Sequence, residues 1–250
     1  MQSATRPLAV ITGGSRGLGY EVAKALALRG FDLALIAKDG ARLATSAQTI
    51  RDHAAQSAIS DLHISTFTCD LEQPNQVRDT IGAITQSLPT PHVLMLAHGV
   101  MSDRMAKTLK TNYAEWRRVM AINLDSVFTI VNEVGAKMAE ARNGRIIIYS
   151  ACLGRMSGPG NAGGLAPYRI SKAGVNALVR NLAHETGHGS RGLWVDAICP
   201  NHSRTDMGGE GAPRSAEEGA ATAVWLATRE LVPGTTQTGL LWEDNEVVPW

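Results

Sequence analysis

The sequence predicts one α/β domain over residues 1–250, built on a parallel sheet that is doubly wound, with helices on both faces. Short apolar runs alternate with longer amphipathic segments along the whole chain. The runs are continuously apolar, which is typical of parallel strands buried on both faces. No linker or shift in composition divides the 250 residues, of which 44% are hydrophobic. That content is enough for one large core.

The first half of the chain predicts four strands and three helices. The expected strands are 8–11, 32–37, 63–68 and 93–97. The expected helices are 18–29, which Gly30 ends, 41–57 and 73–87.

The second half predicts three more helices and up to three more strands. A long helix covers 113–141 and is ended by Asn143-Gly144; the other helices are 168–185 and 216–228. Strands are expected over 145–149 and 194–199, with an edge strand over 238–242. The glycine-rich segment 157–167 is a loop that leads directly to Tyr168.

Composition and charge exclude several classes of function. The net charge is +1, so no strong field favours nucleic acid or a membrane surface as partner. The apolar run near the N-terminus ends at Thr12 and is too short for a signal or a membrane span. Three cysteines, with no Cys-x-x-Cys, are expected to be reduced core thiols of a cytoplasmic protein. No histidine or cysteine spacing predicts a metal site.

A glycine-rich turn joins the first strand to the first helix. In the segment 12–19, Gly13, Gly17 and Gly19 allow a tight turn and a close approach of the backbone to a diphosphate. The diphosphate would then lie at the N-terminus of the helix. The alternative is an ordinary strand–helix turn, but the position in the first βα unit favours phosphate binding.

Tyr168 and Lys172 are four residues apart on a predicted helix and therefore share one face. A nearby ammonium stabilises a phenolate and lowers the pKa of the phenol. The pair is therefore a candidate general acid/base. Tyr-x-x-x-Lys also occurs by chance on many helices, so its weight comes from the glycine-rich turn upstream.

Together, TGGSRGLG at 12–19 and YRISK at 168–172 resemble the short-chain dehydrogenase/reductase superfamily, whose fold is Rossmann-like. Further markers are Cys69-Asp70-Leu71, Asn123 and 204–207, and the segment 208–220 is similar to the carbonyl-reductase-like branch. The resemblance implies that Asp70 and Leu71 contact adenine, and that Thr205 meets the nicotinamide carboxamide. It also implies that Asn123 bends its helix and holds a water that links Lys172 to solvent. The other implied cofactor contacts are Gly13, Ser15, Arg16, Gly17, Leu18, Gly19, Ala97, Gly99 and Pro200.

The cofactor preference follows from charge at the end of the second strand. NAD enzymes place a carboxylate there to accept the ribose hydroxyls. Here the strand runs into Lys38, and Asp39 comes one residue late. Lys38 and Arg16 provide two cations for a 2′-phosphate, which predicts NADP(H). The alternative is that both cations are solvated surface charges.

Three departures from the family pattern fall at carboxyl ends of strands, where such sheets bind ligands. Ala151, three residues before Gly154, occupies the place of the serine that holds the substrate carbonyl. Losing such a donor costs about 100-fold or more in rate. Ser150 is the provisional substitute; another donor, or a reaction that needs none, are the alternatives.

The other departures are His98, within 96–99, and His202, within 200–203. Each histidine taken singly is interpreted as a polar loop residue, but together they indicate altered chemistry or an altered substrate.

The first hypothesis is an NADPH-dependent reductase acting on a carbonyl or imine of a small or bulky organic substrate, in a biosynthetic role. Tyr168 would protonate the alkoxide, with Lys172 and Asn123 assisting. The second is a non-redox member, such as a cyclase, isomerase or dehydratase, or an NADP-binding regulator. The resemblance also implies a homodimer or homotetramer paired through the helices at 113–141 and 168–185. The long loop 155–167 is a feature that can block that pairing.

Overall fold

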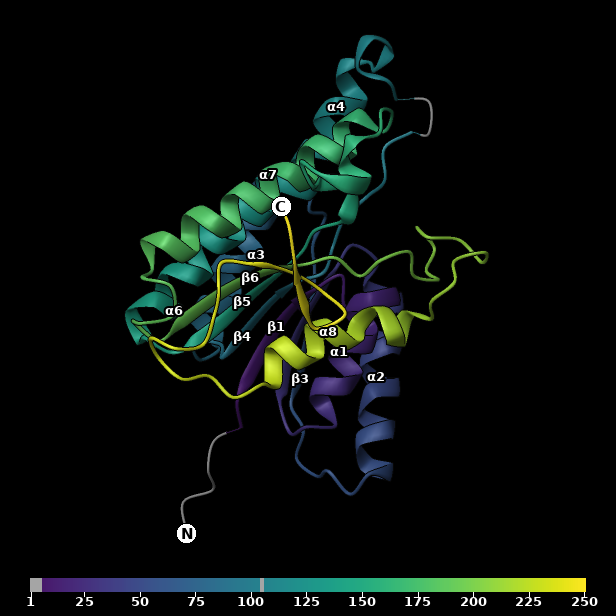
Figure 1. Ribbon diagram of the computed structural model, residues 1–250. Helices are drawn as coiled ribbons and strands as arrows, with labels where there is room; N and C mark the ends of the chain where they lie inside the picture. Colours follow the sequence, from purple (N-terminus) through teal and green to yellow (C-terminus); the bar gives the residue numbers. More distant parts are fainter. Residues whose placement is uncertain (1–5, 104–105) are drawn as a thin grey trace.

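The computed structural model describes residues 6–103 and 106–250, whose eight strands form one sheet in the order β3-β2-β1-β4-β5-β6-β7-β8 (Figure 1). Strands β1 to β7 are parallel, and β8 is antiparallel to β7. The strands are β1 (Leu8–Thr12), β2 (Asp32–Ala37), β3 (Ile64–Thr68), β4 (Val93–Leu96), β5 (Gly144–Tyr149), β6 (Leu193–Ile198), β7 (Leu241–Glu243) and β8 (Glu246–Val248).

Helices cover both faces of the sheet, which confirms the predicted fold class (Figure 1). One face carries α1 (Gly17–Ala27), α2 (Gly40–Gln56) and α8 (Ala216–Thr228). The other face carries α3 (Pro74–Ser87), α7 (Ala166–Glu185) and the long helix over 113–141. Each face has its own apolar core, so the strands are buried on both sides, as their continuous apolar sequences require.

The long helix is not uniformly α-helical. It consists of α4 (Tyr113–Met120), a π-helical turn (Ala121–Asp125), α5 (Ser126–Ile130), a second π-helical turn (Val131–Gly135) and α6 (Ala136–Ala141). The first π-helical turn contains Asn123, at the point where the resemblance implies a bend. By length and apolar composition the span 113–141 could cross a membrane. In the structure its buried residues pack in the core over the sheet.

Most element boundaries differ from the prediction by one or two residues, and two of the differences have a clear local cause. Helix α7 begins at Ala166, two residues earlier than expected, because Pro167 in its first turn suits a helix start. The edge strand lies at 241–243 instead of 238–242, and the chain then turns back into β8. Asp244 and Asn245 make that turn with φ of 54° and 63°, the left-handed geometry of a two-residue hairpin.

Candidate active site

A cleft of about 630 Å³ opens at the carboxyl ends of β1, β2 and β4. This is the edge where open α/β sheets bind ligands. The cleft brings together most of the residues expected to contact a cofactor: Gly13, Ser15, Arg16, Gly17, Leu18, Lys38, Asp70, Leu71, Ala97, Gly99 and Thr205. Gly19 and Pro200 do not line it. Gly19 packs behind the loop instead, and the Pro200 carbonyl accepts a hydrogen bond from the Ser203 hydroxyl.

The backbone of the β1–α1 loop fits a diphosphate. Gly13 and Gly17 have φ of +70° and +55°, which side-chain-bearing residues rarely adopt. A Cβ atom on Gly19 would lie 2.4 Å from the Gly13 carbonyl oxygen, so only glycine allows this approach. The cap residue of α1, Arg16, makes no side-chain capping bond. The first amide groups of α1 therefore remain available for an anion at the end of the helix dipole.

Three cations gather beside this loop, at the end of β2. Arg16 forms an ion pair with Asp206, and an Arg42 nitrogen lies 3.6 Å from the same carboxylate. Lys38 lies 2.8 Å from Asp70. Both predicted cations are thus engaged by carboxylates. Arg42 was missed by sequence reasoning because it lies in α2, beyond the strand end where the family pattern is read.

Tyr168 and Lys172 are both buried, at 6% and 4% exposure, on the face of α7 that meets the sheet. The Lys172 Nζ atom is 6.0 Å from the centre of the Tyr168 ring and donates a hydrogen bond to the Tyr149 carbonyl at 2.7 Å. Burial lowers the pKa of Lys172 to about 8. The ammonium is therefore fixed beside the phenol but held by the end of β5.

The pKa of Tyr168 moves opposite to the expectation from the Tyr/Lys spacing. Burial raises it first, and the neighbouring Cys199 and Cys152 thiols raise it further. The shift is therefore opposite in direction to the one that the Tyr/Lys spacing predicts, because desolvation of the phenolate is its largest cause. The phenol is thus fully protonated at neutral pH, the state required of a proton donor.

Asn123 and Gly99 complete the surroundings of Lys172. The Asn123 side chain donates to the Val100 carbonyl at 2.9 Å and to the Ser171 hydroxyl at 3.1 Å, and it accepts from the Val100 amide at 2.8 Å. A Cβ on Gly99 would lie 3.4 Å from both Asn123 Oδ1 and Lys172 Nζ. The three predicted residues Gly99, Asn123 and Lys172 therefore meet at one point, and Gly99 is the one of them that lines the cleft.

Ser150 does not face this point. Its hydroxyl donates to Asn176 Oδ1 at 2.5 Å, and the Asn176 amide donates to the Gly154 carbonyl at 3.1 Å. These bonds tie the end of β5 to α7 and argue against Ser150 as the substitute for the missing serine. Ala151, 8% exposed, follows it and carries no polar group.

His98 is a structural residue in a closed network. Its Nδ1 atom lies 2.6 Å from the Thr12 hydroxyl, and its Nε2 atom lies 2.9 Å from the Ser126 hydroxyl and 3.1 Å from the Ile122 carbonyl. Burial, reinforced by the charge of Lys172, lowers the pKa of His98 to about 3. A neutral ring with both nitrogens occupied cannot carry protons during a reaction, so the interpretation as a polar structural residue is favoured.

His202 lies on the exposed loop after β6, where its Nε2 atom is 2.8 Å from the Gly208 carbonyl. This contact joins two parts of the loop after β6. Across residues 6–103 and 106–250, no three His, Cys, Asp or Glu side chains are grouped as a metal site would need.

Comparison with known proteins places these features in context. The family model described as short chain dehydrogenase matches residues 7–216. The chain is 30% identical over 200 residues to 3-oxoacyl-(acyl-carrier-protein) reductase FabG of Vibrio cholerae, covering 80% of this chain and 75% of that protein. The FabG protein of Escherichia coli gives the same identity and coverage.

Solved structures show the same fold at lower identity. A short chain dehydrogenase from Salmonella enterica serovar Typhi superposes with a TM-score of 0.81 at 20% identity, covering 97% of this chain and 98% of that one. The actinorhodin polyketide ketoreductase, solved with NADPH, gives a TM-score of 0.76 at 22% identity, covering 91% and 93% of the two chains.

Proposed function

This chain belongs to the short-chain dehydrogenase family, and we propose that it uses NADPH to reduce a carbonyl or imine group of a small organic substrate. The observation that carries the proposal is a protonated, buried Tyr168 beside Lys172 and Asn123, next to a cleft lined by the glycine-rich loop. The relatives named FabG are reductases of 3-oxoacyl groups, which supports a carbonyl as the reacting group.

Tyr168 is the proposed proton donor. NADPH, when bound, supplies the hydride that reaches the substrate carbon. Tyr168 then gives its phenolic proton to the oxygen or nitrogen on which negative charge develops. Lys172 is held by the Tyr149 carbonyl, so its ammonium stays close to Tyr168, and it would be the group to hold the ribose of a bound cofactor. Asn123 fixes the Val100 backbone and Ser171, which keeps this part of the cleft rigid.

The preference for NADPH over NADH rests on Arg16, Lys38 and Arg42. Their ion pairs with Asp206 and Asp70 are on the surface, where such pairs contribute little stability. A 2′-phosphate at the end of β2 can therefore compete for the cations. The ketoreductase solved with NADPH is consistent with this cofactor.

The carbonyl-holding position is the unusual part of the site. Ala151 offers no donor, and the hydroxyl of Ser150 is bonded to Asn176. Negative charge on the Cys152 or Cys199 sulfur would raise the pKa of Tyr168 further. We propose that the substrate is held mainly by the cofactor and Tyr168. A bulky substrate, with contact area of its own, suits that arrangement.

The test is to follow nicotinamide absorbance with NADPH and a panel of ketones, β-ketoesters and cyclic imines. Tyr168→Phe should lower turnover by about 100-fold to 10,000-fold while NADPH binding, measured by fluorescence, stays intact. Product formation without NADPH consumption would support the non-redox alternative. The bonded state of His98 supports the reductase, because a cyclase or dehydratase that used its ring would need a free ring nitrogen.

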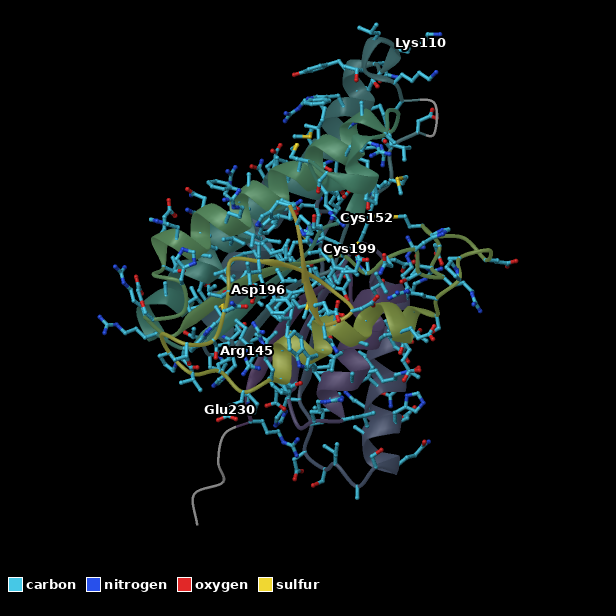
Figure 2. All side chains as sticks on the ribbon, viewed as in Figure 1. Lys110, Arg145, Cys152, Asp196, Cys199 and Glu230 are labelled. Atoms are coloured by element: carbon cyan, nitrogen blue, oxygen red, sulfur yellow. The ribbon has the colours of Figure 1, made fainter. Side chains whose placement is uncertain are left out.

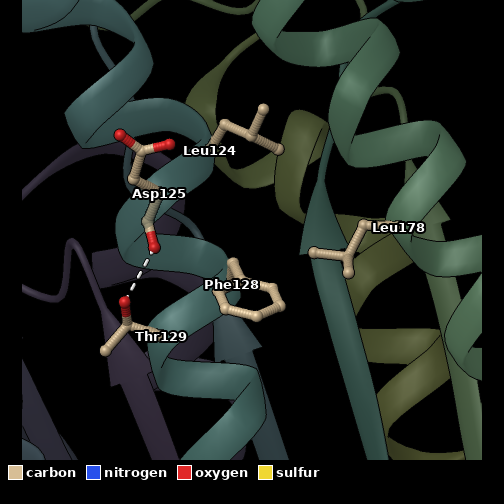
Figure 3. A pocket seen from close by; sticks show the side chains of 5 residues that line it. All are labelled: Leu124, Asp125, Phe128, Thr129 and Leu178. Carbon is tan, nitrogen blue, oxygen red and sulfur yellow. Dashed lines mark hydrogen bonds between the residues drawn. The ribbon is translucent and has the colours of Figure 1, made fainter.

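We also propose a homo-oligomer paired through the long helix and α7. A shallow pocket of about 410 Å³ lies between them, lined by Leu124, Asp125, Phe128, Thr129 and Leu178 (Figure 3). Phe128 is 56% exposed at this pocket, although it is a large apolar side chain. Light scattering should show a dimer or tetramer, and Phe128→Glu should convert it to monomers. A monomeric native chain would contradict this pairing.

A further inference from the structure

Two cysteines far apart in the sequence meet beside Tyr168. Cys152 opens the short 3₁₀ turn Cys152–Gly154 after β5, and Cys199 follows β6. These strands are neighbours, with Tyr149 opposite Ile198. The Cys152 amide donates a hydrogen bond to Cys199 Sγ at 3.0 Å. Both cysteines are labelled in Figure 2. The sulfur of Cys152 is only three bonds from that nitrogen, and the two thiols are hydrogen-bonded to each other, so the two sulfurs lie close together.

The two thiols differ in access and in acidity. Cys199 is buried, at 2% exposure, whereas Cys152 is partly exposed. A hydrogen bond from the Cys199 thiol lowers the pKa of Cys152 to about 6. The same bond, together with burial, raises the pKa of Cys199. Cys152 is therefore the accessible thiolate, and Cys199 is the protonated partner that can resolve an oxidised sulfur.

We propose that Cys152 and Cys199 form a peroxide-sensitive dithiol pair, and that their disulfide lowers turnover at Tyr168. The effect on turnover rests on the proposed reductase function. The formation of the disulfide does not.

The chemistry balances with hydrogen peroxide as the oxidant. The Cys152 thiolate attacks one peroxide oxygen, so an S–O bond forms, the O–O bond breaks and hydroxide leaves. The Cys199 sulfur then attacks the sulfenic sulfur of Cys152, forming the S–S bond and releasing water with the Cys199 proton. Two thiols lose two electrons, and peroxide is reduced to water. A dithiol reductant reverses the reaction by exchange.

The position of the pair explains why its oxidation would affect the reaction. Negative charge on the Cys152 sulfur raises the pKa of the Tyr168 phenol, and a disulfide removes that charge. The turn that starts at Cys152 also rests on the helix that carries Tyr168. A Cβ on Gly154 would lie 2.7 Å from the Lys172 carbonyl carbon, so the two backbones are in close contact. Drawing Cys152 toward β6 therefore disturbs α7 at Lys172, and Ala151, next to the cross-link, moves with it.

The experiment uses the full chain, reduced, freed of reductant and then treated with stoichiometric hydrogen peroxide. Intact-mass measurement should show the loss of two hydrogen atoms, and peptide mapping should link Cys152 to Cys199. NADPH turnover should fall by about 10-fold or more and recover with dithiothreitol. Turnover of each variant is compared with its own reduced form.

Three variants identify the roles of the sulfurs. Cys69→Ser, which removes the third thiol, should still form the cross-link. Cys199→Ser should stop at a sulfenic acid on Cys152 that dimedone traps, and Cys152→Ser should give neither product. Cross-links between chains, or overoxidation of Cys152 without a link to Cys199, would overturn the proposal. If the Cys152–Cys199 disulfide formed and turnover stayed unchanged, the proposed effect of the disulfide on turnover would be wrong. If the reduced chain consumed no NADPH with any substrate, the reductase proposal would fail, whereas the mass measurement would still decide the dithiol pair.

Discussion

The two sides of the cleft differ in how closely they follow the family pattern. On the cofactor side, at β1, β2 and β4, the loop backbone and three cations suit a phosphorylated dinucleotide. On the carbonyl side, at β5 and β6, the proposed proton donor Tyr168 is buried beside Lys172, but Ala151 and a pair of thiols stand where the family pattern has a serine. On the cofactor side, the fit to a ligand depends mainly on backbone geometry. On the carbonyl side, it depends on a few side chains that can be substituted without changing the fold. We therefore expect this chain to differ from the family pattern in how it holds its substrate more than in how it holds its cofactor.

Gly19→Ala is the strongest test of the cofactor side. Its Cβ would lie 2.4 Å from the Gly13 carbonyl oxygen, so the loop must shift. Overpacking of this kind costs about 1–3 kcal/mol, or about 5-fold to 150-fold in NADPH affinity. Gly82→Ala is the matched control, because nothing lies within 4 Å of the added Cβ. Titration of NADPH fluorescence measures both, and equal affinities would contradict the proposed role of the loop.

The pH profile tests the carbonyl side through Lys172. Its pKa is lowered to about 8, so the ammonium is present below that pH and lost above it. The Tyr168 pKa is raised, so the phenol stays protonated over the same range. Reductase kcat/KM should therefore fall about 10-fold per pH unit above about pH 8. Lys172→Arg should remove this decline, because arginine stays charged. A native profile that is level to about pH 10 would show that the ammonium is not needed.

Arg42→Ala tests the third cation of the cleft, Arg42, which was not predicted from the sequence. Loss of one charge-assisted contact to phosphate should weaken NADPH binding by about 10-fold and leave NADH binding unchanged. Arg78→Ala, on α3 and bonded to Asn75, is the control for charge alone. Equal losses for the two cofactors would place the 2′-phosphate elsewhere.

Ala151→Ser should have the smallest effect. The position is 8% exposed and follows β5, so one added hydroxyl is accommodated or supplies the absent donor. We expect kcat/KM with the best ketone to stay within about 3-fold of the native value or to rise. A large loss, with unchanged NADPH affinity, would mean that the pocket is built around the alanine.

The sequence predicted the strands well because continuous apolar runs and glycine-marked ends both indicate them. It missed β8, a three-residue strand whose only signal is the Asp244-Asn245 turn. It could not foresee the Cys152–Cys199 contact, because the two residues meet only when β5 and β6 pair. The predicted direction of the Tyr168 pKa shift was wrong for a related reason. Helical spacing shows that Lys172 is near Tyr168, but it does not show how deeply the phenol is buried, and burial raises its pKa.

The central claim is that hydride from NADPH, paired with the Tyr168 proton, reduces the substrate. The most direct measurement is mass spectrometry of the product formed with NADPH deuterated at C4 of the nicotinamide, using each C4 epimer in turn. The account predicts one deuterium on the former carbonyl or imine carbon from one epimer, with the rate lost in Tyr168→Phe. Product without deuterium from either epimer, formed at the same rate by Tyr168→Phe, would contradict it.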